Sequence, residues 1–196
     1  MCRFYSVLLF PMLWDKYDYV FRLDDDVYLA QDVPVDLFEL MHDRGILYLY
    51  GSEVPEWNKH TRYTFGPWLH GHLLHSRRDG SEQYKFTTAP TSREIWSELG
   101  ADMFFTNFFL SRLDWWKQTH VQHLLSAIDK SGNIYYHRWG DAPIHTVVLR
   151  LFADVCEVLP LCDVSYYHSS TGHLIERCTA RNEDEPERFI EGVDFG

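Results

Sequence analysis

Three consecutive carboxylates, Asp24, Asp25 and Asp26, are the strongest candidates for chemistry in this sequence. Adjacent carboxylates repel one another, so the cluster favours a bound cation that compensates their charge. The residues before it, from Tyr19 to Leu23, are aromatic or β-branched and predict a buried strand. Alternate side chains of an extended segment point the same way, which puts Asp24 and Asp26 on one side. Their oxygens suit Mg²⁺ or Mn²⁺, ions that also hold phosphate oxygens, whereas the alternative interpretation is a solvated acidic turn.

Length and composition indicate one folded domain. The chain has 196 residues, of which 45% are hydrophobic and 16% aromatic, enough for a real core. Its formal net charge of -11 argues against a nucleic-acid partner, because a phosphate backbone is bound by a basic face. An acidic protein still binds an anionic nucleotide when a divalent cation bridges the two. We therefore expect no nucleic acid and retain a metal-bridged nucleotide as a ligand.

Neither a membrane span nor a zinc site is indicated. The chain has no run of about 18 apolar residues, and the apolar stretch at residues 1–11 lacks a cleavage signal for a signal peptide. The cysteines are not spaced as zinc ligands, and they are Cys2, Cys156, Cys162 and Cys178. Two interpretations of them stay open, buried thiols or one or two disulfides in an oxidising compartment.

Strand and helix patterns alternate in the part of the chain that positions the acidic cluster. After the strand over 19–23, Asp32 is expected to cap a helix that ends at Gly45. Residues 46–50 predict a second strand. Residues 53–85 lack a clear period and predict a long irregular segment.

The second half continues this alternation, which predicts an α/β layered fold. Thr91 and Glu94 form a possible capping box for a short helix that ends at Gly100. The further predicted elements are a helix over 114–132, a short strand over 134–136, a helix capped by Asp141, and a strand over 156–159.

Several blocks of sequence accompany the acidic cluster. They are residues 1–6 (MCRFYS), 17–27 (YDYVFRLDDDV), 135–145 (YYHRWGDAPIH) and 163–168 (DVSYYH). Together they resemble the fungal α-1,2-mannosyltransferases of glycosyltransferase family 15, and the string RWGDAP is the most specific part. The resemblance runs from Met1 to about Cys178. We therefore expect a glycosyltransferase domain over residues 1–178 and a charged tail over residues 179–196.

The resemblance implies a fold and an activity. The fold would be GT-A-like, a mixed sheet flanked by helices. The activity would be a retaining transfer of mannose from GDP-mannose to a mannose hydroxyl of a glycoprotein glycan in α-1,2 linkage, with Mn²⁺. The compartment would be the Golgi lumen, with the membrane anchor absent from this chain.

The resemblance also assigns residues to the site. Asp24 takes the place of the family's acidic metal-motif residue, His168 that of its metal-binding histidine, and Asp26 completes the predicted metal site. Asp141 takes the place of a functional aspartate, for which the alternative is a helix N-cap. The residues expected to bind substrate are Arg22, Asn107, Arg138 and Trp139. For Trp139 the alternative is burial in the core.

Departures from the family pattern bear on activity. Phe109 stands where the family has the carboxylate of an Asn-Phe-Glu motif, and His137 stands where it has Glu. A phenyl ring is no nucleophile, so we expect same-face attack within an ion pair and weak or absent transfer with ligand binding retained. The family's chain begins before the position of Met1, and we expect a truncated or divergent member that lacks the first nucleotide-binding strand-helix unit.

Two other functions remain open. One is a catalytically impaired relative that binds glycan or nucleotide, which Phe109 favours. The other is a metal-dependent phosphohydrolase that uses the aspartates and His168, which the string RWGDAP disfavours.

Overall fold

A mixed four-stranded sheet forms the centre of the molecule. The computed structural model describes residues 2–78, 102–161, 164–169 and 174–175. The strand order in the sheet is β1 (Tyr19–Leu23), β6 (Phe108–Arg112), β3 (Tyr48–Tyr50) and β7 (Val158–Pro160). β6 runs antiparallel to both β1 and β3, whereas β3 and β7 are parallel. The predicted α/β fold with a mixed sheet flanked by helices is confirmed.

Two smaller sheets complete the strand pairing. One has the order β2 (Val27–Leu29), β8 (Tyr166–His168) and β9 (Leu174–Ile175), and the other pairs β4 (Glu53–Pro55) with β5 (Asp102–Phe104). The helices are the π-helical η1 (Phe4–Leu8), α1 (Leu9–Leu13), α2 (Leu37–Arg44), α3 (Lys59–Arg78), α5 (Leu113–Trp116), α6 (Thr119–Lys130), α7 (Asn133–Tyr136), α8 (Asp141–Phe152) and the 3-10 turn η2 (Val155–Glu157).

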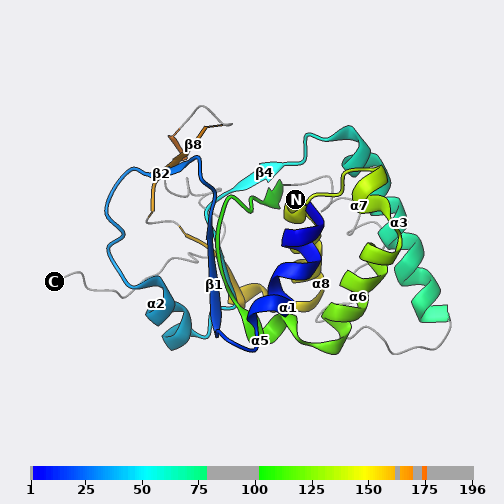
Figure 1. Ribbon diagram of the computed structural model, residues 1–196, viewed down its shortest axis with the longest axis horizontal. Helices are drawn as coiled ribbons and strands as arrows, with labels where there is room; N and C mark the ends of the chain where they lie inside the picture. Colours follow the sequence, from blue (N-terminus) through cyan, green and yellow to red (C-terminus); the bar gives the residue numbers. More distant parts are fainter. Residues whose placement is uncertain (1, 79–101, 162–163, 170–173, 176–196) are drawn as a thin grey trace, which may run out of the picture.

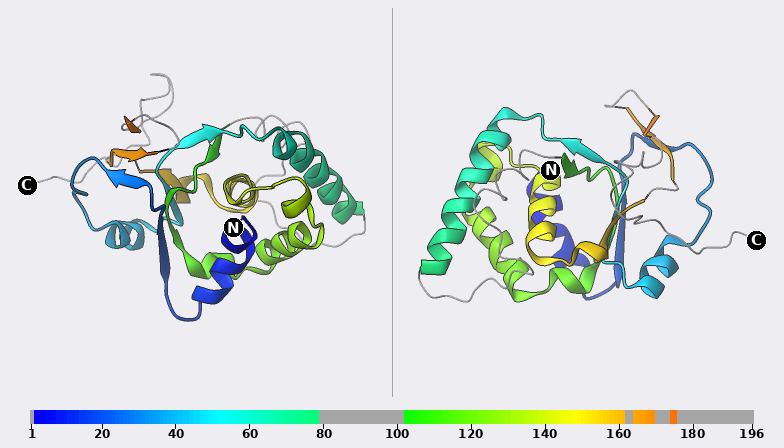
Figure 2. Two further views of the ribbon diagram at one scale, coloured as in Figure 1. Left: turned by 45° about the horizontal axis from the view of Figure 1, so that its top comes forward. Right: turned by 180° about the vertical axis from the view of Figure 1, so that it is seen from behind.

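The sheet separates two hydrophobic cores. Figures 1 and 2 show α1, α3, α6 and α8 on one face of the sheet and α2 on the other. Because side chains alternate along a strand, β6 contributes to both cores. Phe108 and Leu110 pack on the α2 side, and Phe109 packs on the side of α8. Side chains of β6 therefore pack in both hydrophobic cores.

The segment after β4 differs from its prediction. An irregular segment was expected over residues 53–85, but residues 59–78 form the twenty-residue helix α3. Glycines and Pro67 inside it suppress the local helix signal. The helix forms because its buried residues recur about four apart on one face, which packs against the core; they are Thr61, Phe65, Leu69, Leu73 and Ser76.

Other boundaries also need correction. α2 begins at Leu37 with Asp36 as its N-cap, not Asp32, and it ends at Gly45 as predicted. The helix expected over 114–132 is split into α5 and α6, and the strand expected over 134–136 is the helical turn α7. The predicted inner stripe of α6 is confirmed as buried: Val121, Leu124, Leu125 and Ile128.

Some expectations lie outside the described residues. These are the helix at Thr91 to Gly100, the thiols of Cys162 and Cys178, and the tail over 179–196. Cys2 is half-buried and Cys156 is exposed, and both are free thiols, so burial of all four thiols is wrong for Cys156. Within the described part of the chain, none of the helices is both long and apolar enough to cross a membrane.

Candidate functional site

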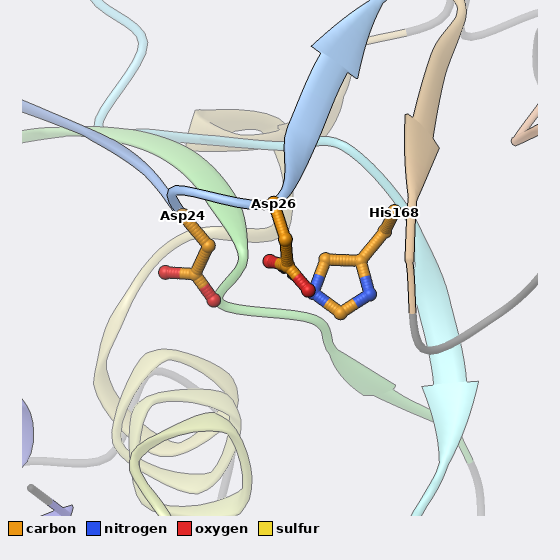
Figure 3. A group of neighbouring side chains, drawn as sticks. All are labelled: Asp24, Asp26 and His168. Carbon is orange, nitrogen blue, oxygen red and sulfur yellow. Dashed lines mark ion pairs between the residues drawn. The ribbon is translucent and has the colours of Figure 1, made fainter.

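Asp24, Asp26 and His168 converge on one point of the structure. One ligand atom from each lies within 4.8 Å of the other two, and Figure 3 shows the three side chains pointing toward a common space. Nε2 of His168 is 3.2 Å from Oδ1 of Asp26, close enough for the two residues to share one ion. His168 is buried, whereas the carboxylates are partly exposed. Two carboxylates and an imidazole are a donor set that fits a divalent cation such as Mn²⁺.

Strand pairing explains how residues so far apart in sequence meet. β2 and β8 are antiparallel with Val27 opposite His168, so the turn before β2 lies beside the end of β8. The Ser169 backbone N–H donates to the Asp26 carbonyl, and the Ser169 hydroxyl donates to the Asp26 carboxylate. This hydroxyl, assisted by the charge of His168, holds the pKa of Asp26 below its ordinary value. Asp26 is therefore ionised near neutral pH, the state in which a carboxylate binds a metal ion.

Tyr166 of β8 belongs to a buried cluster of polar side chains. The Tyr166 hydroxyl donates to Oδ1 of Asn107 at 3.2 Å and lies 3.0 Å from the hydroxyl of Ser52. Gly51 is required here, because a Cβ at this position would come within 2.8 Å of the Tyr166 ring. The backbone carbonyl of Asn107 accepts the N–H of Asp24 at 2.9 Å, which ties the cluster to the acidic turn.

Asn107 contributes to the site in another way than predicted. It is only 1% exposed, and among the described residues its Nδ2 has no hydrogen-bond partner. The predicted contact with substrate stays a prediction, and in this structure the amide is enclosed by protein. Asn107 instead fixes the position of Asp24 and Tyr166.

Arg22 joins the acidic turn to the start of α8. Its Nε donates to Oδ1 of Asp24 at 2.9 Å, and its Nη1 donates to Oδ2 of Asp141. The hydroxyl of Thr106 donates to the same oxygen of Asp141 at 2.8 Å. The ring of Tyr5 lies under the guanidinium, 3.8 Å from Cζ to the ring centroid. The substrate contact predicted for Arg22 stays a prediction, and the structure adds two carboxylate partners.

Asp141 is an ionised carboxylate at the first turn of α8. The N-cap of this helix is Gly140, so Asp141 is not the cap that the sequence suggested. Burial by itself would raise the pKa of Asp141, but the charges of protonated His145 and of Arg22 and the bond from Thr106 outweigh it and lower the pKa. A carboxylate in this state accepts hydrogen bonds and does not donate a proton near neutral pH.

His145 lies fully buried one helical turn after Asp141. Its Nε2 is 3.1 Å from the backbone carbonyl of Tyr5, whereas its Nδ1 has no partner among the described residues. Burial lowers the pKa of His145 to about 4, against an opposing effect of Asp141 and the Tyr5 carbonyl. The imidazole is therefore neutral in the folded protein over the physiological range.

A pH dependence of stability follows from His145. The unfolded protein protonates this residue near 6.5 and the folded protein near 4, so the unfolded state binds more protons between these values. Stability is full above about pH 6.5 and falls by about 3 kcal/mol as the pH drops to about 4. Asp141 adds its own loss only below its ordinary pKa of 3.8.

Urea unfolding at several pH values measures this effect. The His145→Leu variant should lose the steep part of the slope between pH 6.5 and pH 4. The exposed residue His123 on α6 serves as the control, and His123→Leu should keep the wild-type slope. Equal slopes in wild type and His145→Leu would contradict the assignment.

Two residues expected at a sugar-binding surface belong to the core. Trp139 is fully buried between Phe65 and Trp68, and its Nε1 donates to the hydroxyl of Thr64 at 2.9 Å. The predicted stacking of Trp139 on a sugar is wrong, and the alternative of burial in the core is correct.

Phe109 also needs a correction. It stands where the family has a carboxylate, but its ring is 0% exposed and belongs to the core. It stacks on Tyr48 with the centroids 5.2 Å apart and meets His145 edge-on at 5.5 Å. Phe109 lies opposite Arg22 in the β1–β6 pair, so both side chains leave the same face of the sheet.

Arg138 is exposed, as a substrate-binding role requires, and that role stays a prediction. It is the non-glycine residue with a positive φ in the described part of the chain, at 54°. Its backbone carbonyl accepts a hydrogen bond of 2.9 Å from the hydroxyl of Thr61, which holds this uncommon conformation.

Four residues of the site escaped the sequence analysis. They are Tyr5, Ser52, Thr106 and Ser169. Ser169 directly follows His168, so its position next to a predicted ligand was a usable signal. For the others, the sequence has no local pattern that marks them.

The comparisons with known proteins agree with this geometry. A family model described as glycolipid 2-alpha-mannosyltransferase matches residues 1–185. The chain belongs to this family. Among its relatives, the O-glycoside alpha-1,2-mannosyltransferase omh1 of Schizosaccharomyces pombe is 29% identical over 100% of this chain and 49% of its own length. The probable mannosyltransferase YUR1 of Saccharomyces cerevisiae is 28% identical over 94% of this chain and 48% of its own length.

Solved structures of mannosyltransferases share the fold. Core-mannan synthase A from Aspergillus fumigatus, in its Mn/GDP form, matches with a TM-score of 0.69 and 25% identity over 86% of this chain and 47% of that chain. The mannosyltransferase Ktr4p from S. cerevisiae in complex with GDP also gives 0.69 and 25%, over 86% and 44%. The predicted GT-A-like fold and the family are confirmed. The chain spans about half the length of the relatives it matches.

Proposed function

We propose that this chain carries the metal-binding half of a retaining α-1,2-mannosyltransferase that uses GDP-mannose and Mn²⁺. The observation that carries the proposal is the convergence of Asp24, Asp26 and His168 within 4.8 Å, after the strand that the family resemblance marks. It is supported by relatives named as α-1,2-mannosyltransferases and by a solved relative in its Mn/GDP form.

One group of site residues is proposed to bind the metal ion, and another residue is proposed to bind the acceptor. Asp24, Asp26 and His168 would hold the ion, which when bound would neutralise the diphosphate as a Lewis acid for the departing nucleotide. Without the positive charge of this ion, the site could not offset the negative charges of a nucleoside diphosphate. The partial exposure of Asp24 and Asp26 leaves this face of the site open to the ligand.

Asp141 is the candidate residue for the acceptor. Its pKa is lowered, and Arg22 and Thr106 both donate to its Oδ2. An ionised carboxylate held in this way orients an attacking hydroxyl by accepting its hydrogen bond. The acceptor we propose is a mannose hydroxyl of a glycoprotein glycan.

Retention of configuration sets a further requirement. A carboxylate nucleophile at position 109 is absent, because that position holds the buried ring of Phe109. Same-face attack, with the leaving phosphate close to the incoming hydroxyl, therefore fits this chain better than a covalent intermediate. Stabilisation of the leaving group would then supply most of the rate.

The compartment we propose is the Golgi lumen. The support is the family resemblance, since transfer of mannose to glycoprotein glycans by its fungal members implies that location. Microscopy of a tagged, natively expressed protein together with a Golgi marker tests it, and a signal confined to the cytosol would contradict it.

A transfer assay tests the activity. The chain is incubated with radiolabelled GDP-mannose, an α-mannoside acceptor and Mn²⁺. The expected product is a labelled disaccharide that an α-1,2-mannosidase cleaves, in low yield because position 109 lacks a carboxylate. Chelation of the metal should abolish the product. GDP binding without any transfer would favour a catalytically impaired relative, and release of free mannose with no disaccharide would favour a hydrolase.

A further inference from the structure

Arg22 is held on three sides by the described residues. Asp24 binds its Nε at 2.9 Å, Asp141 binds its Nη1, and the Tyr5 ring covers one face of the guanidinium at 3.8 Å. The side chain is only 15% exposed. Burial would lower the pKa of Arg22, but Asp141 and Asp24 raise it above its ordinary value, so the group stays charged. A planar guanidinium with these contacts has little rotational freedom.

This arrangement fixes the carboxylate of Asp24. One oxygen, Oδ1, accepts the bond from Arg22, and the N–H of the same residue is tied to Asn107. The plane of the carboxylate is therefore set before an ion arrives. Mutation of a partner that orients a metal ligand in this way typically lowers metal affinity by roughly 10- to 100-fold.

The same guanidinium also controls the charge of Asp141. Without Arg22, this mostly buried carboxylate would keep only the bond from Thr106, and the acidic cluster nearby would repel it. Arg22 thus connects the predicted metal ligands at the end of β1 to the first turn of α8.

We propose that Arg22 is a positioning residue that pre-organises Asp24 for a divalent cation, with Tyr5 as the support of its guanidinium. The inference rests on the metal-dependent nucleotide binding proposed above. It assigns Arg22 a role through Asp24 rather than a contact with substrate.

A competing effect has to be separated from positioning. The positive charge of Arg22 repels a cation, so removing it altogether would strengthen metal binding by Coulomb's law. Arg22→Lys keeps this charge but lacks the planar fork that bonds two carboxylates at once. Any loss of metal affinity in this variant therefore reports on geometry.

The experiment measures Mn²⁺ binding in the presence of GDP. Electron paramagnetic resonance of free Mn²⁺ gives the dissociation constant without any transfer reaction. Arg22→Lys is expected to raise it about tenfold. Tyr5→Leu removes the ring but keeps the backbone carbonyl that His145 contacts, and it should raise the constant by a smaller factor. The thermal unfolding midpoint of each variant is measured alongside, and the titrations are done well below that temperature.

Arg112 provides a matched control. Like Arg22 it donates through two nitrogens, but both bonds go to the single carboxylate of Asp114, at the far end of β6. Arg112→Lys should leave the Mn²⁺ dissociation constant within about twofold of wild type, because it removes a similar pair without touching a metal ligand.

Two outcomes would overturn the inference in different ways. If wild type binds Mn²⁺ and the Arg22→Lys and Tyr5→Leu variants bind it equally well, positioning by Arg22 is refuted while the proposed metal site stands. If wild type binds no Mn²⁺, the metal site itself is refuted, and the role of Arg22 at it is refuted too. Should Arg22→Lys fail to fold, an unchanged constant in Tyr5→Leu overturns the inference on its own.

Discussion

Replacing His168 by alanine is expected to weaken Mn²⁺-dependent binding of GDP by at least about a hundredfold. The buried imidazole is the nitrogen donor of the cluster, and its Nε2 lies 3.2 Å from Asp26. Without it, two carboxylates alone would have to hold the ion. Calorimetric titration of GDP with and without Mn²⁺ measures the effect.

Controls distinguish lost coordination from general damage. His123→Ala removes an exposed histidine on α6 and should bind GDP as wild type does. Chelation of the metal should bring wild type down to the affinity of His168→Ala. If GDP binds His168→Ala with wild-type affinity, or if Mn²⁺ makes no difference to wild type, the assigned metal site is wrong.

Phe109→Glu is expected to unfold a large fraction of the protein rather than to create a nucleophile. The ring is fully enclosed, with Tyr48 at 5.2 Å and His145 at 5.5 Å. Losing a buried Phe costs about 3–5 kcal/mol, and the buried carboxyl of Glu adds a further penalty. A loss of this size approaches the total stability of many domains, about 5–15 kcal/mol. The burial of Phe109 is the reason to expect a loss of stability here, although the family has a carboxylate at this position.

Urea unfolding of wild type, Phe109→Leu and Phe109→Glu measures this cost. Phe109→Leu keeps an apolar side chain and should lose only about 1–2 kcal/mol. Arg22 is the cross-strand neighbour of position 109, but Asp24 and Asp141 already engage its guanidinium. A Phe109→Glu protein with the wild-type midpoint would show that Arg22 or His145 takes up the new carboxylate.

The parts of the fold with a strong local period were predictable from the sequence. A strand forms over 19–23 as predicted, although it is only partly buried and Phe21 and Leu23 are exposed. The buried stripe of α6 appears as expected, because a helical period of 3.6 residues is visible in the sequence itself. α3 was missed because its glycines and Pro67 hide its period, and only packing of one face against the core stabilises the helix. Local propensity was overridden there by tertiary burial.

The residues of the site likewise fall into those that the sequence identified and those that only the tertiary structure placed. The sequence alone determined the carboxylates after a strand, and the family pattern identified His168 and Asp141, since these depend on residue types in short blocks. Only the tertiary structure decided that β8 pairs with β2 and so brings His168 to Asp26. It also decided that Arg22 faces Asp24 and Asp141, and that Trp139 and Phe109 are buried. Partner choice and burial depend mostly on segments that lie far apart along the chain, and a local pattern has no information about such contacts.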